Sequence, residues 1–218
     1  DKNDIMIDQI LKRVNGTINK GGVKPIAYDI VWSEQTPPKQ LILFVHGFKG
    51  FKDWGIWNTV ADDFANNGVA FLKINLSHNG TTPDHLEDFV DLEAFGKNNF
   101  TREIDDIKRT VTALKEGLAE VPTGFINLEL ILIGHSRGGA SAIIAAKELQ
   151  GINKLVTWAA IDDIPSRYGE FDEDWKKEGV KYVANGRTGQ QMPLYFQLYR
   201  DIQGNQQRFD LSVALKDY

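Results

Sequence analysis

The strongest constraint on the fold is a glycine-rich turn that directly follows an apolar run. Residues 130–140 read Leu-Ile-Leu-Ile-Gly-His-Ser-Arg-Gly-Gly-Ala, so Ser136 stands in a G-x-S-x-G pattern. The apolar run predicts a buried strand, and the residues after Ser136 have the spacing of a helix. A sharp strand-to-helix turn strains the serine backbone and needs small neighbours, which Gly134, Gly138 and Gly139 supply. The pattern therefore predicts a raised serine hydroxyl that a base can activate, and the alternative is an ordinary turn of an α/β sheet.

A second motif lies about ninety residues earlier. Residues 41–50 read Leu-Ile-Leu-Phe-Val-His-Gly-Phe-Lys-Gly, which predicts a strand that ends in the loop His46-Gly47-Phe48 before the next helix. In acyl transfer, negative charge grows on the carbonyl oxygen, and two fixed backbone N–H groups can stabilise it. The expected donors are the N–H groups of Phe48 and of Arg137, with His46 bracing the turn.

Three segments carry a resemblance to a known family: LILFVHGFKGFKDW, VAFLKINLSHNGTT and LILIGHSRGGA. Together they resemble the α/β-hydrolase superfamily, and within it the small bacterial esterases of the dienelactone-hydrolase and cinnamoyl-esterase kind. The resemblance covers roughly residues 24–162. It implies an α/β fold with an eight-stranded, mostly parallel sheet flanked by helices, a Ser-acid-His triad, no metal and no organic cofactor. Carried over by position, Ser136 is the nucleophile, and Phe48 and Arg137 are the oxyanion donors.

The histidines depart from the pattern of that superfamily, in which the catalytic histidine follows the serine along the chain. All four histidines here precede Ser136. We expect the His135 side chain to face away from the serine hydroxyl, because successive side chains at a strand end point in opposite directions. His78 and His85 lie in a polar loop, which favours solvated surface positions.

The number of predicted strands explains why no histidine follows Ser136. Strand-like runs occur at Ile26 to Trp32, Leu41 to Val45, Val69 to Asn75, Leu128 to Ile133 and Lys154 to Ala160, with an earlier one near Ile7 to Val14. These are five or six of the eight strands, and no comparable run follows Ala160. We therefore expect residues 1–218 to form a single α/β-hydrolase domain that is truncated before its last two strands, with the general base beyond Tyr218.

The segment from about residue 164 to residue 210 is predicted to be a cap or lid inserted after the strand that ends near Ala160. Such an insertion lies at the edge of the sheet where α/β folds bind ligands. Its aromatic side chains could cover an acyl group or simply pack the cap onto the sheet. Asp162 and Asp163 at the end of that strand are candidates for the triad acid, with a helix or turn cap as the alternative.

One helix is well defined by its periodicity. Apolar residues recur at spacings of three and four from Ile104 to Leu118, with Thr101 as the expected N-cap. The charged residues between them are interpreted as a solvated face.

Composition excludes several classes of function. The net charge of −5 argues against nucleic acid or an anionic membrane as the main partner. No stretch is long and apolar enough to span a bilayer, and the chain has no cysteine. No signal peptide is visible, which favours a cytoplasmic location and leaves secretion open, and the sequence indicates no oligomeric state. The predicted function is a serine hydrolase for a small-molecule ester or acyl substrate; the alternatives are a peptidase or thioesterase of the same fold, or a non-catalytic binding module.

Overall fold

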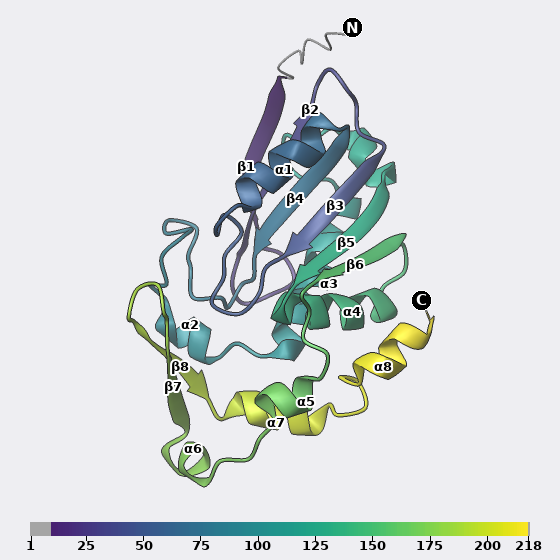
Figure 1. The fold of residues 1–218 in the computed structure, drawn as a ribbon. Helices are drawn as coiled ribbons and strands as arrows, with labels where there is room; N and C mark the ends of the chain where they lie inside the picture. Colours follow the sequence, from purple (N-terminus) through teal and green to yellow (C-terminus); the bar gives the residue numbers. More distant parts are fainter. Residues whose placement is uncertain (1–9, 218) are drawn as a thin grey trace, which may run out of the picture.

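A six-stranded sheet forms the centre of the molecule in the computed structural model, which describes residues 10–217 (Figure 1). The strand order is β1-β2-β4-β3-β5-β6. Strands β3 to β6 run parallel to one another, and β2 is antiparallel to both of its neighbours. The strands are β1 (Leu11–Ile18), β2 (Ile26–Ser33), β3 (Gln40–Val45), β4 (Val69–Asn75), β5 (Glu129–His135) and β6 (Lys154–Trp158).

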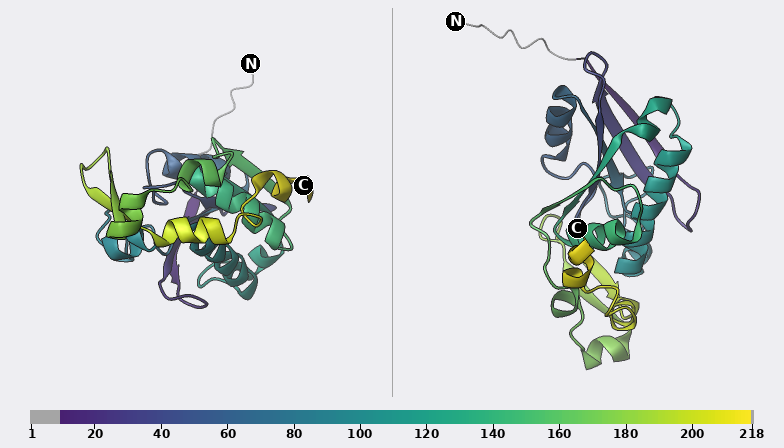
Figure 2. Two further views of the ribbon diagram at one scale, coloured as in Figure 1. Left: turned by 90° about the horizontal axis from the view of Figure 1, so that it is seen from below. Right: turned by 90° about the vertical axis from the view of Figure 1, so that its right-hand side faces the viewer.

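Helices cover both faces of the sheet, as the right-hand view of Figure 2 shows. Helix α1 (Trp57–Asn66) lies on one face, and α3 (Phe100–Glu116) and α4 (Arg137–Glu148) lie on the other. Successive side chains of β3 divide between the two apolar layers: Ile42 belongs to the α1 side, and Leu41 belongs to the α3 and α4 side. This alternation explains why the central strands read as continuous apolar runs.

The smaller elements connect and flank these layers. They are α2 (Leu92–Gly96), the 3-10 helices η1 (Thr123–Asn127) and η2 (Leu215–Asp217), and α8 (Leu211–Ala214). Within residues 10–217, no helix combines the length and apolar character that a bilayer crossing requires.

Residues 164–210 lie beyond the carboxyl ends of the parallel strands (Figure 1). This segment comprises α5 (Ile164–Tyr168), α6 (Glu173–Glu178), β7 (Val180–Ala184), β8 (Gln191–Tyr195) and α7 (Gln197–Gly204). Strands β7 and β8, which the sequence did not predict, form an antiparallel hairpin outside the main sheet. The hairpin was missed because its strands are short and β7 is only partly buried.

The ends of several elements differ from those expected. The first strand is Leu11–Ile18 rather than Ile7 to Val14, and residues 7–9 of that prediction lie outside the described residues. The N-cap of α3 is Asn99, whose side chain accepts a hydrogen bond from the N–H of Arg102, so the prediction of Thr101 is wrong. Thr101 instead donates its hydroxyl to Asp201, at 2.5 Å.

The charged residues of α3 do not all form a solvated face. Glu103 and Asp106 are both buried, which corrects that expectation. Asp106 accepts a hydrogen bond from the backbone N–H of Ser77 and pairs with Arg109. Burial raises the pKa of Asp106 to about 6, against the opposing effect of these partners. Buried charges of this kind persist only where other elements supply partners, which the periodicity of one helix cannot reveal.

Candidate active site

Ser136 occupies a sharp turn between β5 and α4. Its backbone has φ 53° and ψ −121°, a conformation that costs a non-glycine residue about 1–3 kcal/mol. The turn is held from both sides, because the Ser136 N–H donates to the Trp158 carbonyl at 2.9 Å and the Ser136 carbonyl accepts from the Gly139 N–H at 2.9 Å. The sequence therefore folds here into the strained strand-to-helix corner that the G-x-S-x-G pattern predicts.

The fold requires glycine at the positions around Ser136, because other parts of the chain approach them closely. A Cβ atom at Gly134 would collide with the Gly138 carbonyl, and one at Gly138 would collide with the His46 carbonyl. A Cβ atom at Gly139 would lie 2.6 Å from that of Ala160. Larger residues at these positions would thus push β5, α4 and the loop after β3 apart.

The loop after β3 lies directly against the serine. A Cβ atom at Gly47 would be 3.0 Å from the Cβ of Ser136 and 3.3 Å from Nδ1 of His135. The predicted motif residues His46, Gly47 and Phe48 are therefore brought to the predicted serine, although nearly ninety positions separate them in the sequence.

Ser136 lines a cavity of about 230 Å³. One wall is the loop His46 to Gly50, a second includes Trp57 and His135, and a third is the turn Asn185 to Arg187 between β7 and β8. Lys49 ties the first wall to the third by donating its Nζ to the carbonyl of Ala184 at 2.8 Å. The Ser136 side chain is partly exposed and makes no hydrogen bond within residues 10–217, so it is free to meet a ligand in this cavity.

Two backbone N–H groups, one in a residue that lines the cavity and one in the residue directly after Ser136, have no acceptor in the part of the chain that the structure describes. One belongs to Phe48 in the loop after β3, and the other to Arg137, the first residue of α4. The N–H groups in the first turn of a helix lack intrahelical partners and carry partial positive charge. Neither group is engaged in the sheet, so both remain available to an oxygen of a bound ligand.

His46 is buried and both of its ring nitrogens are engaged. Nδ1 lies 2.9 Å from the carbonyl oxygen of Gly47, which can only accept, and Nε2 lies 3.3 Å from the N–H of Leu76, which can only donate. These partners fix the neutral tautomer with the proton on Nδ1. Burial lowers the pKa of His46 to about 4, although the hydrogen bond to Gly47 acts in the opposite direction.

The other histidines are placed in three different environments. His135 lines the same cavity as Ser136, with its ring centroid 5.2 Å from that of Trp57, and burial lowers its pKa. His78 is buried, so the expectation of a solvated position is wrong for it; its Nδ1 lies 2.7 Å from the Ser77 hydroxyl. His85 is exposed in a turn. Among the described residues, no histidine nitrogen makes a hydrogen bond with the Ser136 hydroxyl.

The two aspartates that follow β6 are exposed and do not line the cavity. Asp163 is the N-cap of α5, because its carboxylate accepts a hydrogen bond from the N–H of Ser166 at 3.1 Å. Asp162 makes no hydrogen bond or ion pair within residues 10–217. The structure thus brings Ser136, Phe48 and Arg137 together and leaves both aspartates at the surface.

The Arg137 side chain forms a cluster that the sequence did not predict. Its guanidinium carbon lies 4.3 Å from the ring centroid of Phe100, 4.9 Å from that of Tyr168 and 5.5 Å from that of Phe48. We call these four side chains the Arg137 cluster. They come from the loop after β3, from α3, from α4 and from α5, so no local pattern in the sequence could have indicated the contact.

The aromatic side chains of residues 164–210 serve more than one purpose. Trp175 and Phe196 are buried and pack the segment together, whereas Tyr182 is exposed. Tyr168 and Trp175 also line a second cavity of about 190 Å³, which Phe48 borders from the other side. Packing is thus observed for Trp175 and Phe196, and the covering of an acyl group stays a prediction, because Ser136 does not line this second cavity.

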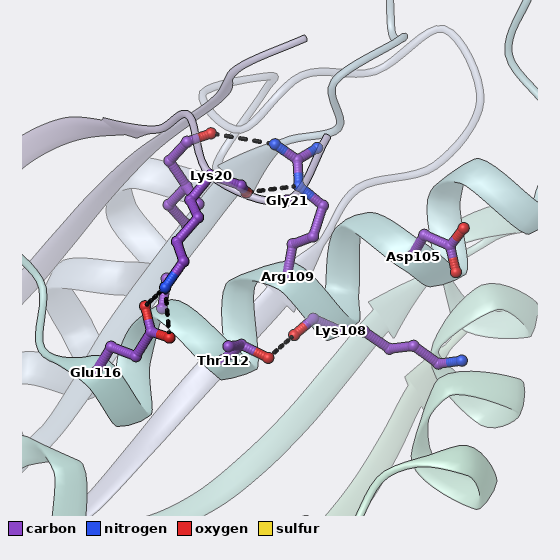
Figure 3. Close-up of a pocket in the computed structure, with 9 residues that line it drawn as sticks. Lys20, Gly21, Asp105, Lys108, Arg109, Thr112 and Glu116 are labelled. Carbon is purple, nitrogen blue, oxygen red and sulfur yellow. Dashed lines mark hydrogen bonds and ion pairs between the residues drawn. The ribbon is translucent and has the colours of Figure 1, made fainter. Parts of the chain in front are cut away.

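A larger cavity of about 330 Å³ lies elsewhere, between the end of β1 and α3 (Figure 3). Its charged side chains are directed at other groups of the chain: Lys20 pairs with Glu116, and Arg109 donates to the carbonyl of Lys20 (Figure 3). It contains no residue of the serine turn or of the loop after β3. Within residues 10–217, no group of three or more histidine, cysteine, aspartate or glutamate residues is arranged to hold a metal ion.

Comparison by sequence finds no matching protein-family model and no matching curated protein. Comparison by structure finds clear similarities. Est1E from Butyrivibrio proteoclasticus, solved with ferulic acid bound, is 20% identical with a TM-score of 0.62, and the match covers 87% of this chain and 70% of that one. The mouse alpha/beta hydrolase domain-containing protein 10 is 15% identical with a TM-score of 0.60, covering 88% of this chain and 70% of that one.

A third similar structure is dienelactone hydrolase from Anabaena variabilis, with 19% identity and a TM-score of 0.55. That match covers 69% of this chain and 64% of the hydrolase, so the chain spans less than two thirds of its length. At such identities the likeness is one of fold.

Proposed function

We propose that this chain, which has the α/β-hydrolase fold, is a serine hydrolase that cleaves carboxylic esters through an acyl-enzyme on Ser136. One observation carries the proposal: the strained Ser136 lines a cavity beside two N–H groups that have no acceptor among the described residues. A binding protein would gain nothing from maintaining the strained turn and both free donors at once. The esterases among the similar structures agree with this reading.

The chemistry follows from these groups. The Ser136 oxygen attacks the ester carbonyl carbon and forms a C–O bond, and the carbonyl oxygen takes up the negative charge. The N–H groups of Phe48 and Arg137 stabilise this charge, and each such donor is worth about 3–4 kcal/mol. The bond to the alcohol then breaks and the alcohol leaves with a proton. Water attacks the acyl-enzyme by the same route and releases the acid.

The proton of Ser136 needs an acceptor. His46 cannot serve, because both of its nitrogens are engaged within the fold, and His78 and His85 do not line the cavity. His135 does line it, but makes no hydrogen bond with the Ser136 hydroxyl within residues 10–217. We therefore propose that the base is a histidine outside the described residues, oriented by a carboxylate for which Asp162 and Asp163 stay candidates. An imidazole added in solution should be able to replace it.

Residues 164–210 act as the cap in this proposal. The turn Asn185 to Arg187 closes the cavity, and about 230 Å³ is suited to a small acyl or alcohol group. This favours a small-molecule ester over a folded protein substrate. A thioester would react by the same steps, since only the leaving atom differs.

The experiment is labelling of the 218-residue chain with a fluorophosphonate probe at increasing imidazole concentration. We expect Ser136 to be labelled slowly without imidazole and at a rate that rises with its concentration, because the proposed nucleophile and donors lie together while no histidine of residues 10–217 makes a hydrogen bond with Ser136. The Ser136→Ala variant should lose the label completely. Modified peptides identified by mass spectrometry locate the site.

The His135→Gln variant is the matched control, because this side chain lines the same cavity. It should be labelled about as fast as the parent chain. Absence of labelling at Ser136 at every imidazole concentration would favour the non-catalytic binding module instead. Labelling that persists in Ser136→Ala would assign the nucleophile to another residue.

A further inference from the structure

The residues that carry the two proposed oxyanion donors share a side-chain neighbour in α5. The ring centroid of Tyr168 lies 6.1 Å from that of Phe48 in an edge-on arrangement, and 4.9 Å from the guanidinium carbon of Arg137. Phe100 completes the cluster, with its centroid 5.6 Å from that of Tyr168. Tyr168 is the member of the Arg137 cluster that belongs to residues 164–210.

The guanidinium in the cluster is firmly anchored on its other side. Arg137 is 2% exposed, and its Nε lies 2.8 Å from Oε1 of Glu103, which is also 2% exposed. Glu103 in turn accepts hydrogen bonds from Ser141, at 2.6 Å, and from Asn98, at 2.8 Å. Removing either partner of such a buried ion pair strongly destabilises the fold, so the guanidinium is held in one position.

Besides Glu103, the structure places aromatic rings against the Arg137 guanidinium. Nη2 of Arg137 is buried and makes no hydrogen bond within the described residues. The faces of aromatic rings attract a desolvated guanidinium, and rings packed edge to face hold one another in place. Tyr168 packs on both Phe48 and Arg137, which also lie 5.5 Å from each other, so its ring helps to fix their relative position.

We propose that Tyr168 is a positioning residue that sets the two oxyanion donors through their side chains. This inference rests on the proposed function and extends it, because it links residues 164–210 to the rate of the chemical step. A donor acts only when its N–H lies within a few tenths of an ångström of the developing oxyanion. When the ring is absent, Phe48 and Arg137 lose their common contact, and the two N–H groups no longer converge.

Three variants separate this role from general packing. Tyr168→Ala removes the ring, whereas Tyr168→Phe keeps it and removes a hydroxyl that makes no hydrogen bond within residues 10–217. Tyr199→Ala is the matched control in the same segment: its ring packs on Phe196 and Phe171, at centroid distances of 5.1 and 5.5 Å, outside the Arg137 cluster.

The first measurement is the rate of fluorophosphonate labelling at Ser136 with imidazole present. We expect Tyr168→Ala to be slower by about 10- to 100-fold, as misplaced groups in an active site commonly are. Tyr168→Phe and Tyr199→Ala should stay within about twofold of the parent chain. Thermal unfolding of each variant checks that the fold is retained.

The second measurement needs no reactive serine. In ¹⁵N-labelled chain, the backbone order parameters of Phe48 and Arg137 should fall in Tyr168→Ala, because the two residues are held less rigidly, and should keep the parent values in the other two variants. Equal effects of Tyr168→Ala and Tyr199→Ala on both readouts would overturn the inference. If the parent chain is never labelled, the proposed function fails, and the order parameters still decide whether Tyr168 positions these two residues.

Discussion

His46 illustrates how neighbours can assign a residue to structure rather than to catalysis. Its two partners fix one neutral tautomer, and its burial opposes protonation. The pKa of the folded state lies at about 4, below the ordinary value of 6.5 that the unfolded chain retains. Between these two pH values the unfolded chain binds a proton that the folded chain does not, so acidification favours unfolding.

The first prediction follows from this difference. Neutral His46 contributes to the free energy of unfolding. This contribution should be fully present above about pH 6.5 and should fall by about 3 kcal/mol as the pH is lowered to 4. The His46→Gln variant should lack this part of the pH dependence. Urea unfolding of both proteins at pH 7, 5.5 and 4 measures it, and parallel stability curves for the two proteins would refute the prediction.

At the scale of elements, a buried group of charges ties the loop after Phe48 to the sheet. Lys52 lies 2.7 Å from Asp29 on β2, and Lys73 on β4 lies 2.6 Å from Asp53 and 3.4 Å from Asp29. Lys52 also contacts Asp53. Burial alone would raise the pKa of Asp53, but hydrogen bonds from the two lysines hold it below its ordinary value.

The second prediction concerns Lys73, which is fully buried. In the Lys73→Met variant, Asp29 keeps Lys52 and the more distant Arg13, at 3.5 Å, while Asp53 keeps only Lys52 among the described cations, so the free energy of unfolding should fall by about 3 kcal/mol. Lys20→Met removes an exposed pair with Glu116 and should cost less than about 1 kcal/mol. Denaturant unfolding at pH 7 compares them. A loss in Lys73→Met no larger than in Lys20→Met would mean that the buried group contributes little.

The sequence predicted those features whose cause lies in neighbouring residues, and it missed those that depend on another element. The apolar runs of β3, β4 and β5 and the glycines around Ser136 carry their structural reason within a few residues. The buried state of Glu103, by contrast, depends on Arg137 and Ser141 from α4. No periodicity within α3 could have indicated partners from another helix.

The β7–β8 hairpin carried only a weak local signal. Its first strand, Val180 to Ala184, includes β-branched and aromatic residues, but it is five residues long and only partly buried. The cluster around Arg137 carried no such signal. Its members lie far apart in the sequence, so only the packing of α5 against the loop after β3 could reveal it.

At the scale of the whole molecule, β6 forms one edge of the described sheet. It pairs with β5 on one side, and the described residues provide no strand on the other. Val156 in its centre is 37% exposed, and Lys154 is its only charged residue. An open, weakly charged edge strand offers its free N–H and C=O groups to other strands.

The third prediction is that the 218-residue chain associates with itself through this edge. Sedimentation velocity should detect association that increases with protein concentration, and Val156→Lys should weaken it because a charge opposes edge pairing. Val23→Lys is the matched control, since Val23 is 91% exposed and lies away from β6. Identical association in both variants would exclude β6 as the contact.

The unusual backbone of Ser136 has an implication for how this protein evolves. Glycine adopts positive φ angles with far less strain than serine, so a single substitution at this corner would make the folded chain more stable. Selection for stability would favour that exchange wherever the hydroxyl had no use. Keeping a serine here lowers stability, and lineages in which its hydroxyl serves no purpose are expected to replace it early.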